Sequence, residues 1–267
     1  MPNGDILYWA DSSNWPGGSP LGLFVLDTAT GVSKLISTEL GGPIDVASDG
    51  RIAGGIGPYG LAILDTAGRE LWHRETGLRV GTLDFGPQEN DLYFCVTLEH
   101  GPDAIIGLLH TTLAETTGLE TTLFDAGYGH LSPDGSQFVY QGDGDEEQPV
   151  AYFRRSLPDG EPELLFRSDY TAGFCINPVH PEWLAVGVRG DGRHQLMGRR
   201  ILLYNMDTGE SVTYEAAPEE NCDVSVRCWS PDGRDVLIWV GPYKRGDPIR
   251  PLFSEVWVAR DVLRGRL

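Results

Sequence analysis

A short turn motif recurs along this chain. Ser-Pro-Asp-Gly separates two apolar runs in RCWSPDGRDVLIW (227–239) and again in GHLSPDGSQFVY (129–140). Looser versions occur in IDVASDGRIAGGI (44–56) and MPNGDILYW (1–9). Proline fixes φ, aspartate bonds the nearby backbone and glycine accepts a positive φ, so each copy predicts a tight turn between two strands. A unit that repeats in this way is evidence for a repeated architecture, and it is interpreted first as structure and only then as chemistry.

The spacing of these turns predicts the fold. They recur about every 46 residues, close to the length of one propeller blade. A second series of turns lies between them, at 27–31, 65–68, 115–118, 158–160 and 207–209. Two turns per repeat imply a four-stranded meander, so we predict an all-β, six-bladed β-propeller of four-stranded antiparallel blades. It forms a single domain over 1–267, with blades at 1–41, 42–78, 79–126, 127–169, 170–220 and 221–267.

The two ends of the chain limit how this propeller can close. The first predicted blade lacks the strand before its first turn, and only residues 261–267 follow the last predicted strand, SEVWVAR. Those residues can complete the last blade or lend a strand to the first, but not both. We therefore predict at least one incomplete blade with an exposed sheet edge. In the third blade, LLHTTLAETTGLETTLF (108–124) could pass for a helix, but its threonines favour strands.

Composition excludes several classes of function. The formal net charge of −19 argues against general nucleic-acid binding, which depends on Lys and Arg at phosphates. No apolar run approaches the roughly 18 residues of a membrane span, and the first residues lack the features of a signal peptide. We expect a cytoplasmic protein that binds neither nucleic acid nor membrane. The four cysteines show no C-x-x-C spacing, which favours buried thiols over a metal site or disulfides.

Variable loops between the second and third strand of each blade are the expected place for function. They lie on one face of a rigid scaffold, at 10–21, 97–104, 141–150, 189–200 and 241–253. The last two carry seven of the 20 basic residues, namely Arg189, Arg193, Arg199, Arg200, Lys244, Arg245 and Arg250. Arginine forks match planar carboxylates, so these loops can form an anion site, for example for uronates. Pairing with Asp191, Asp247 and other acidic loop residues is the alternative.

Two aromatic residues accompany the basic loops. Trp15 and Tyr243 can stack on the apolar face of a sugar ring or anchor their own loops, and the sequence leaves both uses open.

Potential metal ligands align at one position of the first strand of successive blades. This position holds Asp45, Asp84, His130, Cys175 and Cys228. Their expected separations across a six-bladed channel exceed the ~2–2.3 Å bonds that one ion needs, so packing between blades is favoured over a metal site. The acidic run at 143–147 could bind Ca²⁺, but it lacks an EF-hand pattern and a solvated loop is favoured.

The turn motif resembles that of TolB-like and WD40-like propellers. A narrower stretch, 174–210 followed by CWSPDGRDVLIWVG (228–241), resembles oligogalacturonate lyases through Asn177, Pro178, Pro181, Arg189, Gly190, His194 and Trp229. The resemblance implies an acidic oligosaccharide or small anionic ligand, cleavage by β-elimination and a divalent cation such as Mn²⁺ or Ca²⁺. The chain is one blade shorter than these seven-bladed lyases, and their histidine-rich metal site is not recognisable.

β-Elimination needs a base for the proton alpha to the carboxylate and a cation to stabilise the enolate. His194 is the first candidate for the base, with Arg189 and Arg193 as the carboxylate clamp, and His130 is the second. The predicted function is a carbohydrate-binding β-propeller for a uronate oligosaccharide, with an oligogalacturonate-lyase-like activity. The alternative is a non-catalytic scaffold that binds a protein through its loop face or an open blade edge.

Overall fold

The described part of the chain is built from β-strands. A computed structural model describes residues 1, 3–10, 22–57, 59–88, 91–97, 106–112, 120–124, 128–169, 173–189, 198–215, 222–242 and 255–266. Within these ranges every regular element is a strand and no helix is present, which confirms the all-β prediction. It follows that no described helix has the length and hydropathy needed to cross a membrane. The chain divides into two compact units, Met1–Gly135 and Ser136–Leu267.

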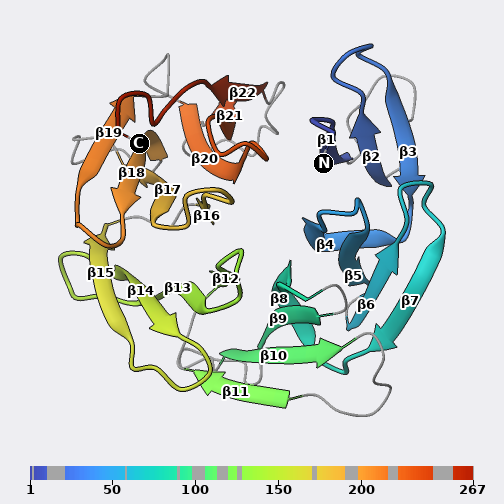
Figure 1. Cartoon of the computed structure of the whole chain (residues 1–267), viewed down its shortest axis with the longest axis horizontal. Coiled ribbons are helices and arrows are strands. Elements are labelled where there is room, and N and C mark those ends of the chain that lie inside the picture. Colours follow the sequence, from blue (N-terminus) through green and yellow to red (C-terminus); the bar gives the residue numbers. More distant parts are fainter. Residues whose placement is uncertain are drawn as a thin grey trace. The chain divides into compact units, whose positions relative to one another are not determined.

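The first unit contains three antiparallel sheets in chain order (Figure 1). The first sheet has the order β1 (Ile6–Ala10), β2 (Gly22–Leu26) and β3 (Ser33–Ser37). The second has the order β4 (Leu40–Val46), β5 (Ile52–Ile56), β6 (Gly60–Leu64) and β7 (Glu70–Glu75). The third has the order β8 (Arg79–Phe85), β9 (Asp91–Thr97), β10 (Ile106–Thr112) and β11 (Glu120–Phe124). β10 and β11 are strands, so the strand prediction for the threonine-rich stretch is confirmed at its described residues, 108–112 and 120–124.

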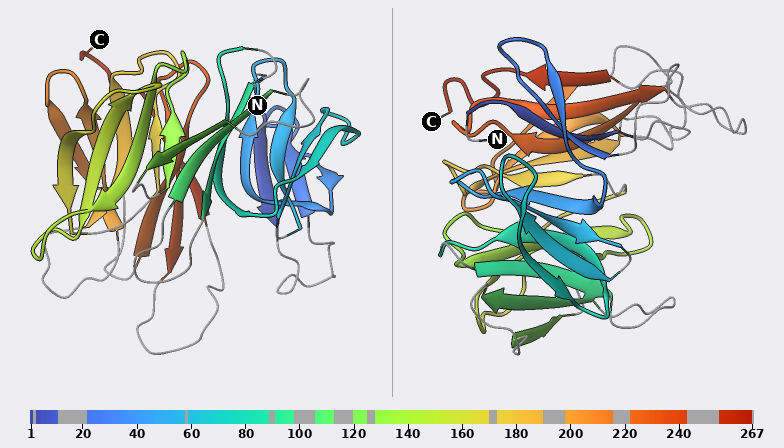
Figure 2. Two further views of the ribbon diagram at one scale, coloured as in Figure 1. Left: turned by 90° about the horizontal axis from the view of Figure 1, so that it is seen from below. Right: turned by 90° about the vertical axis from the view of Figure 1, so that its right-hand side faces the viewer.

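Three more sheets follow the same pattern. The fourth begins with β12 (Gly129–Leu131) and continues through β13 (Gln137–Asp143), β14 (Val150–Ser156) and β15 (Glu163–Ser168). The fifth consists of β16 (Phe174–Ile176), β17 (Trp183–Arg189), β18 (Gly198–Asn205) and β19 (Ser211–Glu215). The sixth consists of β20 (Cys222–Trp229), β21 (Val236–Pro242) and β22 (Glu255–Ala259). Figure 2 shows their strands as twisted antiparallel ribbons joined by turns.

The prediction of at least one incomplete blade is confirmed in the described residues. Four sheets have four strands, whereas the first and the last have three. Each sheet otherwise falls within one predicted segment, except that β4 begins at Leu40 instead of within 42–78. The prediction that 1–267 forms a single domain stays a prediction.

The Pro-Asp-Gly turns have the geometry that their residues predict. Gly135 and Gly233 adopt positive φ angles of 71° and 70°. Their N–H groups donate to the carbonyl oxygens of Ser132 and Ser230 at 2.8 and 2.9 Å, which closes each turn. Within the last turn, the Ser230 hydroxyl donates to Asp232, whose carboxylate also accepts the N–H of Arg234. Glycine is needed at these positions because side chains rarely tolerate this backbone conformation.

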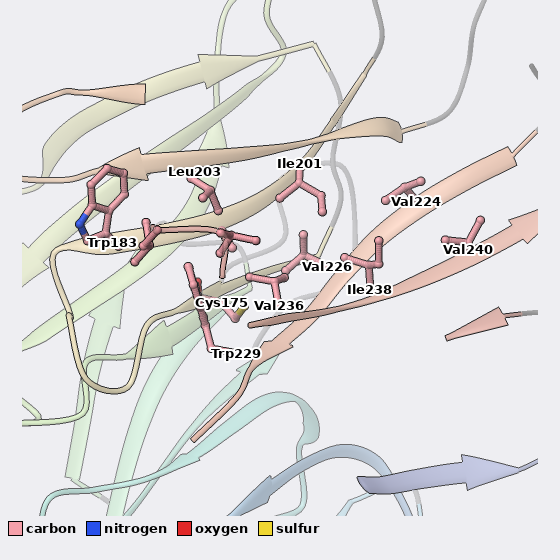
Figure 3. Packing of buried hydrophobic residues seen from close by; sticks show 13 residues of the cluster. Cys175, Trp183, Ile201, Leu203, Val224, Val226, Trp229, Val236, Ile238 and Val240 are labelled. Atoms are coloured by element: carbon pink, nitrogen blue, oxygen red, sulfur yellow. The ribbon is translucent and has the colours of Figure 1, made fainter. Parts of the chain in front are cut away.

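Apolar residues between neighbouring sheets form the cores. In the first unit, buried residues of β5 and β6 pack against Leu83, Leu92 and Phe94 of the third sheet. In the second unit, residues of the fifth and sixth sheets form one cluster that includes Trp183 and Trp229 (Figure 3). Alternate residues of each strand point to opposite sides of its sheet, so a strand buried on both sides is apolar throughout, as in β6.

Among the described residues, the segment after β22 forms no strand and so adds no strand to a blade. After β22 the chain forms turns through Arg266, and Val262 and Leu263 are buried in the core of the fifth and sixth sheets. The N–H of Val262 donates to the Arg234 carbonyl, and the Tyr214 hydroxyl donates to the Val262 carbonyl. Burying two apolar side chains here is more favourable than leaving them on a strand exposed to water.

Candidate functional site

Two aspartates tie the first strands of neighbouring sheets together. Asp45 on β4 accepts the N–H of Phe85 on β8 at 2.8 Å. One sheet further on, Asp84 on β8 accepts the N–H of Leu131 on β12 at 3.2 Å. The two contacts join equivalent positions, which shows that the alignment of Asp45, Asp84 and His130 in the sequence is correct. The repeated geometry gives both carboxylates a structural role.

His130 adds a feature that this backbone pattern does not require. Its Nδ1 lies 2.9 Å from the second oxygen of Asp84, and the side chains are 35% and 19% exposed (Figure 1 shows β8 and β12). An ionised carboxylate only accepts hydrogen bonds, so Nδ1 carries the hydrogen. In the neutral imidazole the lone pair is then on Nε2, the nitrogen that can take up a proton. A base held by a second group is the arrangement that proton-transfer sites use.

Burial and the Asp84 carboxylate shift the pKa values of Asp45 and His130. Burial, and then the nearby Asp84 carboxylate, raises the pKa of Asp45 to about 6. Burial lowers the pKa of His130, but the Asp84 carboxylate outweighs that effect and raises this pKa above its ordinary value. Asp45 therefore changes charge at about pH 6, and His130 keeps its proton to a higher pH than an ordinary histidine. Groups with such shifted pKa values are frequent at functional sites, although structural ion pairs produce them too.

The aligned ring of potential ligands does not form a metal centre in the described residues. No group of three or more His, Cys, Asp or Glu side chains there has a metal-binding arrangement. In the second unit, Cys175 is buried and Cys228 is exposed. Burial, and to a lesser extent Cys228, raises the pKa of Cys175 well above its ordinary value, so it is a protonated thiol.

The acidic run forms a turn between β13 and β14. Asp145 accepts the N–H groups of Glu147 and Gln148, and its carboxylate lies 3.3 Å from Arg167. These contacts use the carboxylate oxygens to shape the hairpin, as expected for a solvated loop.

Most of the predicted loop residues fall outside the described part of the chain. These are Trp15, Arg193, His194, Tyr243, Lys244, Arg245 and Arg250. Arg189 ends β17 and Arg199 lies on β18, but the structure does not describe their side chains. Arg200 is described and pairs with Glu215 on the neighbouring strand β19. For Arg200 the pairing interpretation therefore fits better than the anion site.

Two residues that carry the lyase resemblance have structural contacts. Asn177 is fully buried, and its side-chain amide donates to the Gly233 carbonyl at 2.8 Å while its oxygen accepts the N–H groups of Val179 and His180. The Trp229 indole donates to the Cys175 carbonyl at 3.1 Å. Both side chains hold the fifth and sixth sheets together, so their presence does not indicate catalysis.

The sequence analysis missed two exposed residues in the segments that carry His130 and Asp84. Tyr128 precedes β12 and is 53% exposed, and Arg79 is exposed at the start of β8. Each lies at the N-terminal end of its strand, opposite to the turn that follows the strand. Their positions in the sequence could have identified them. Tyr128 is two residues before His130, and Arg79 begins the strand that carries Asp84.

Comparisons with known proteins identify the fold. No protein-family model matches the sequence, and no curated protein matches it. Among solved structures, hydrazine synthase of Kuenenia stuttgartiensis aligns with a TM-score of 0.59 and 14% identity, over 97% of this chain and 81% of that one. TolB from Acinetobacter baumannii aligns with a TM-score of 0.59 and 16% identity, over 90% of this chain and 60% of TolB.

A third match is a gluconolactonase from Xanthomonas campestris. It has a TM-score of 0.53 and 13% identity, over 81% of this chain and 75% of that one. At such low sequence identities a structural likeness shows the fold only, and function has to be argued from the residues of the site. The resemblance to oligogalacturonate lyases stays a prediction. The successive antiparallel meanders and these likenesses together show that the chain has the β-propeller fold, as TolB does.

Proposed function

We propose that this chain binds a uronate-containing oligosaccharide and cleaves it by β-elimination, with His130 as the base. The observation that carries this proposal is the 2.9 Å contact between His130 Nδ1 and Asp84, which fixes the imidazole and directs proton transfer to Nε2. The lyase resemblance supports the reaction.

The reaction uses the His–Asp pair directly. Nε2 of His130 takes the proton from the carbon alpha to the uronate carboxylate. The electrons of that C–H bond form a double bond to the next carbon, and the bond from that carbon to the glycosidic oxygen breaks. The leaving oxygen takes up a proton, which the imidazolium can return. Asp84 stabilises the imidazolium between these two steps.

The uronate carboxylate needs a cation, because Asp45 and Asp84 would repel it. Arg79 is exposed at the start of β8, five residues before Asp84 and more than about 10 Å away along the strand, so it can meet the carboxylate of a neighbouring uronate ring. An arginine can hold such a carboxylate through two parallel hydrogen bonds. Binding by the arginines of 189–200 and by the basic residues of 241–253 stays a separate prediction. If a divalent cation such as Mn²⁺ or Ca²⁺ takes part, residues beyond the described cluster must hold it.

A binding experiment tests the ligand class. Isothermal titration of the protein with trigalacturonate and with neutral galactotriose should show at least tenfold tighter binding of the charged sugar, because one arginine–carboxylate contact contributes about 1.5–3 kcal/mol. Arg79→Gln should remove most of this preference. Arg69→Gln is the matched control, since Arg69 is an exposed arginine paired with Asp65. Equal affinity for both sugars, or no binding of either, would favour the protein-binding scaffold.

A further inference from the structure

The aromatic ring of Tyr128 is held over the backbone of β8. Gly81 is the extra residue at a bulge in this strand, where the register with β9 shifts between Val80 and Thr82. A Cβ atom at Gly81 would lie 2.6 Å from Cε1 and 3.0 Å from Cδ1 of the Tyr128 ring. The absence of a side chain at Gly81 therefore makes room for the ring. Despite this contact Tyr128 remains 53% exposed, so part of the ring faces solvent.

The ring is close to the His–Asp pair along the chain. Tyr128 forms a bend directly before β12 and is two residues from His130 along the chain. Two residues of a strand span about 6–7 Å. Gly81 and Asp84 are likewise near each other on β8, which places the ring and the imidazole beside the same stretch of that strand.

We propose that Tyr128 is the stacking platform of a sugar subsite next to His130. This inference rests on the proposed function and adds a residue that determines which ring of the oligosaccharide lies beside the base. The C–H groups of one pyranose face pack on the exposed part of an aromatic ring, and this contact requires the ring but not the tyrosine hydroxyl. Charge recognition by Arg79 is a separate contact, made by the carboxylate of the sugar.

Substitutions of the ring and of the residue beneath it test the proposal. Isothermal titration with trigalacturonate should show at least fivefold weaker binding for Tyr128→Ala and near-wild-type binding for Tyr128→Phe. Gly81→Ala should also weaken binding, because its methyl group displaces the ring without removing it. Tyr59→Ala is the control, since Tyr59 is a similarly exposed tyrosine on the β5–β6 turn. Melting temperatures of all variants should stay close to that of the wild type.

The outcomes separate this inference from the proposed function. If the wild type binds trigalacturonate and Tyr128→Ala binds it equally well, the stacking subsite is overturned while the proposed function stands. If Tyr128→Phe loses affinity as Tyr128→Ala does, the hydroxyl is the contact and stacking is overturned. If the wild type binds no trigalacturonate, both proposals fail. Weaker binding by Tyr128→Ala and Gly81→Ala, with Tyr59→Ala unchanged, supports the subsite.

Discussion

At the scale of single residues, Asp45 shows how one carboxylate can both hold the fold and oppose it. Its oxygen accepts the Phe85 N–H, which joins β4 to β8. Its negative charge is unfavourable because the group is partly buried and close to the Asp84 carboxylate, and these effects raise its pKa from 3.8 to about 6. The hydrogen bond needs only an oxygen acceptor, so an asparagine can keep the contact and remove the charge.

Asp45→Asn should therefore stabilise the protein near pH 7 by on the order of 1–3 kcal/mol. A carboxyl whose pKa is raised in the folded state contributes stability below its unfolded pKa, and this contribution is lost as the pH rises through the folded value, here about 6. The gain should be present at pH 7 and absent near pH 4, as measured by urea unfolding. An unchanged or lower stability at pH 7 would contradict the assignment.

Asp27→Asn provides the opposite control. Hydrogen bonds from Thr30 lower the pKa of Asp27, so its charge favours the folded state. Its contribution is present above the unfolded pKa and is lost as the pH falls through the lower folded value. This variant should be less stable than the wild type at pH 7, whereas Asp45→Asn should be more stable.

At the scale of elements, the strands were predictable because turn residues and apolar runs are local signals. Asp49-Gly50 and Asp134-Gly135 each lie between two strands of one sheet, as predicted. The end of the chain was not predictable in this way. Val262 and Leu263 pack against apolar side chains that are distant in the sequence. A segment of seven residues is too short to show a hydrophobic periodicity that would predict this packing.

The site was predictable in part for the same reason. Alignment of equivalent strand positions brought Asp45, Asp84 and His130 together, but only the structure shows that Asp84 holds His130. The contact of Tyr128 with Gly81 depends on a bulge in β8, and bulges leave little trace in a single sequence. Arg200 was predicted as a ligand residue because the sequence does not show that Glu215 lies across from it on β19.

The C-terminal segment should stabilise the fifth and sixth sheets by packing rather than by strand pairing. Leu263 is 2% exposed, and Leu263→Ala should lower the free energy of unfolding by about 2–5 kcal/mol through lost burial and a cavity. Leu71→Ala is the control, because Leu71 is 54% exposed and its truncation should change stability by less than about 0.5 kcal/mol. Equal stability of both variants in urea unfolding would show that the segment does not pack here.

At the scale of the whole molecule, charge opposes compaction. The chain has 39 acidic and 20 basic residues, and its net charge of −19 produces self-repulsion in the folded state. Salt screens this repulsion over a Debye length of about 8–10 Å near physiological ionic strength. The melting temperature should therefore rise from low to moderate NaCl, and KCl should act alike because screening depends on ionic strength. A flat or falling melting temperature would contradict this account.

The most direct test of the proposed function is whether the protein forms an unsaturated uronate. With trigalacturonate, with and without added Mn²⁺ or Ca²⁺, the wild type should generate a product that absorbs in the ultraviolet through its new double bond. The rate should increase as the pH rises through the raised pKa of His130. His130→Gln should abolish the product while trigalacturonate still binds. No product from a wild type that binds the sugar, or loss of product in His194→Ala but not in His130→Gln, would contradict the account.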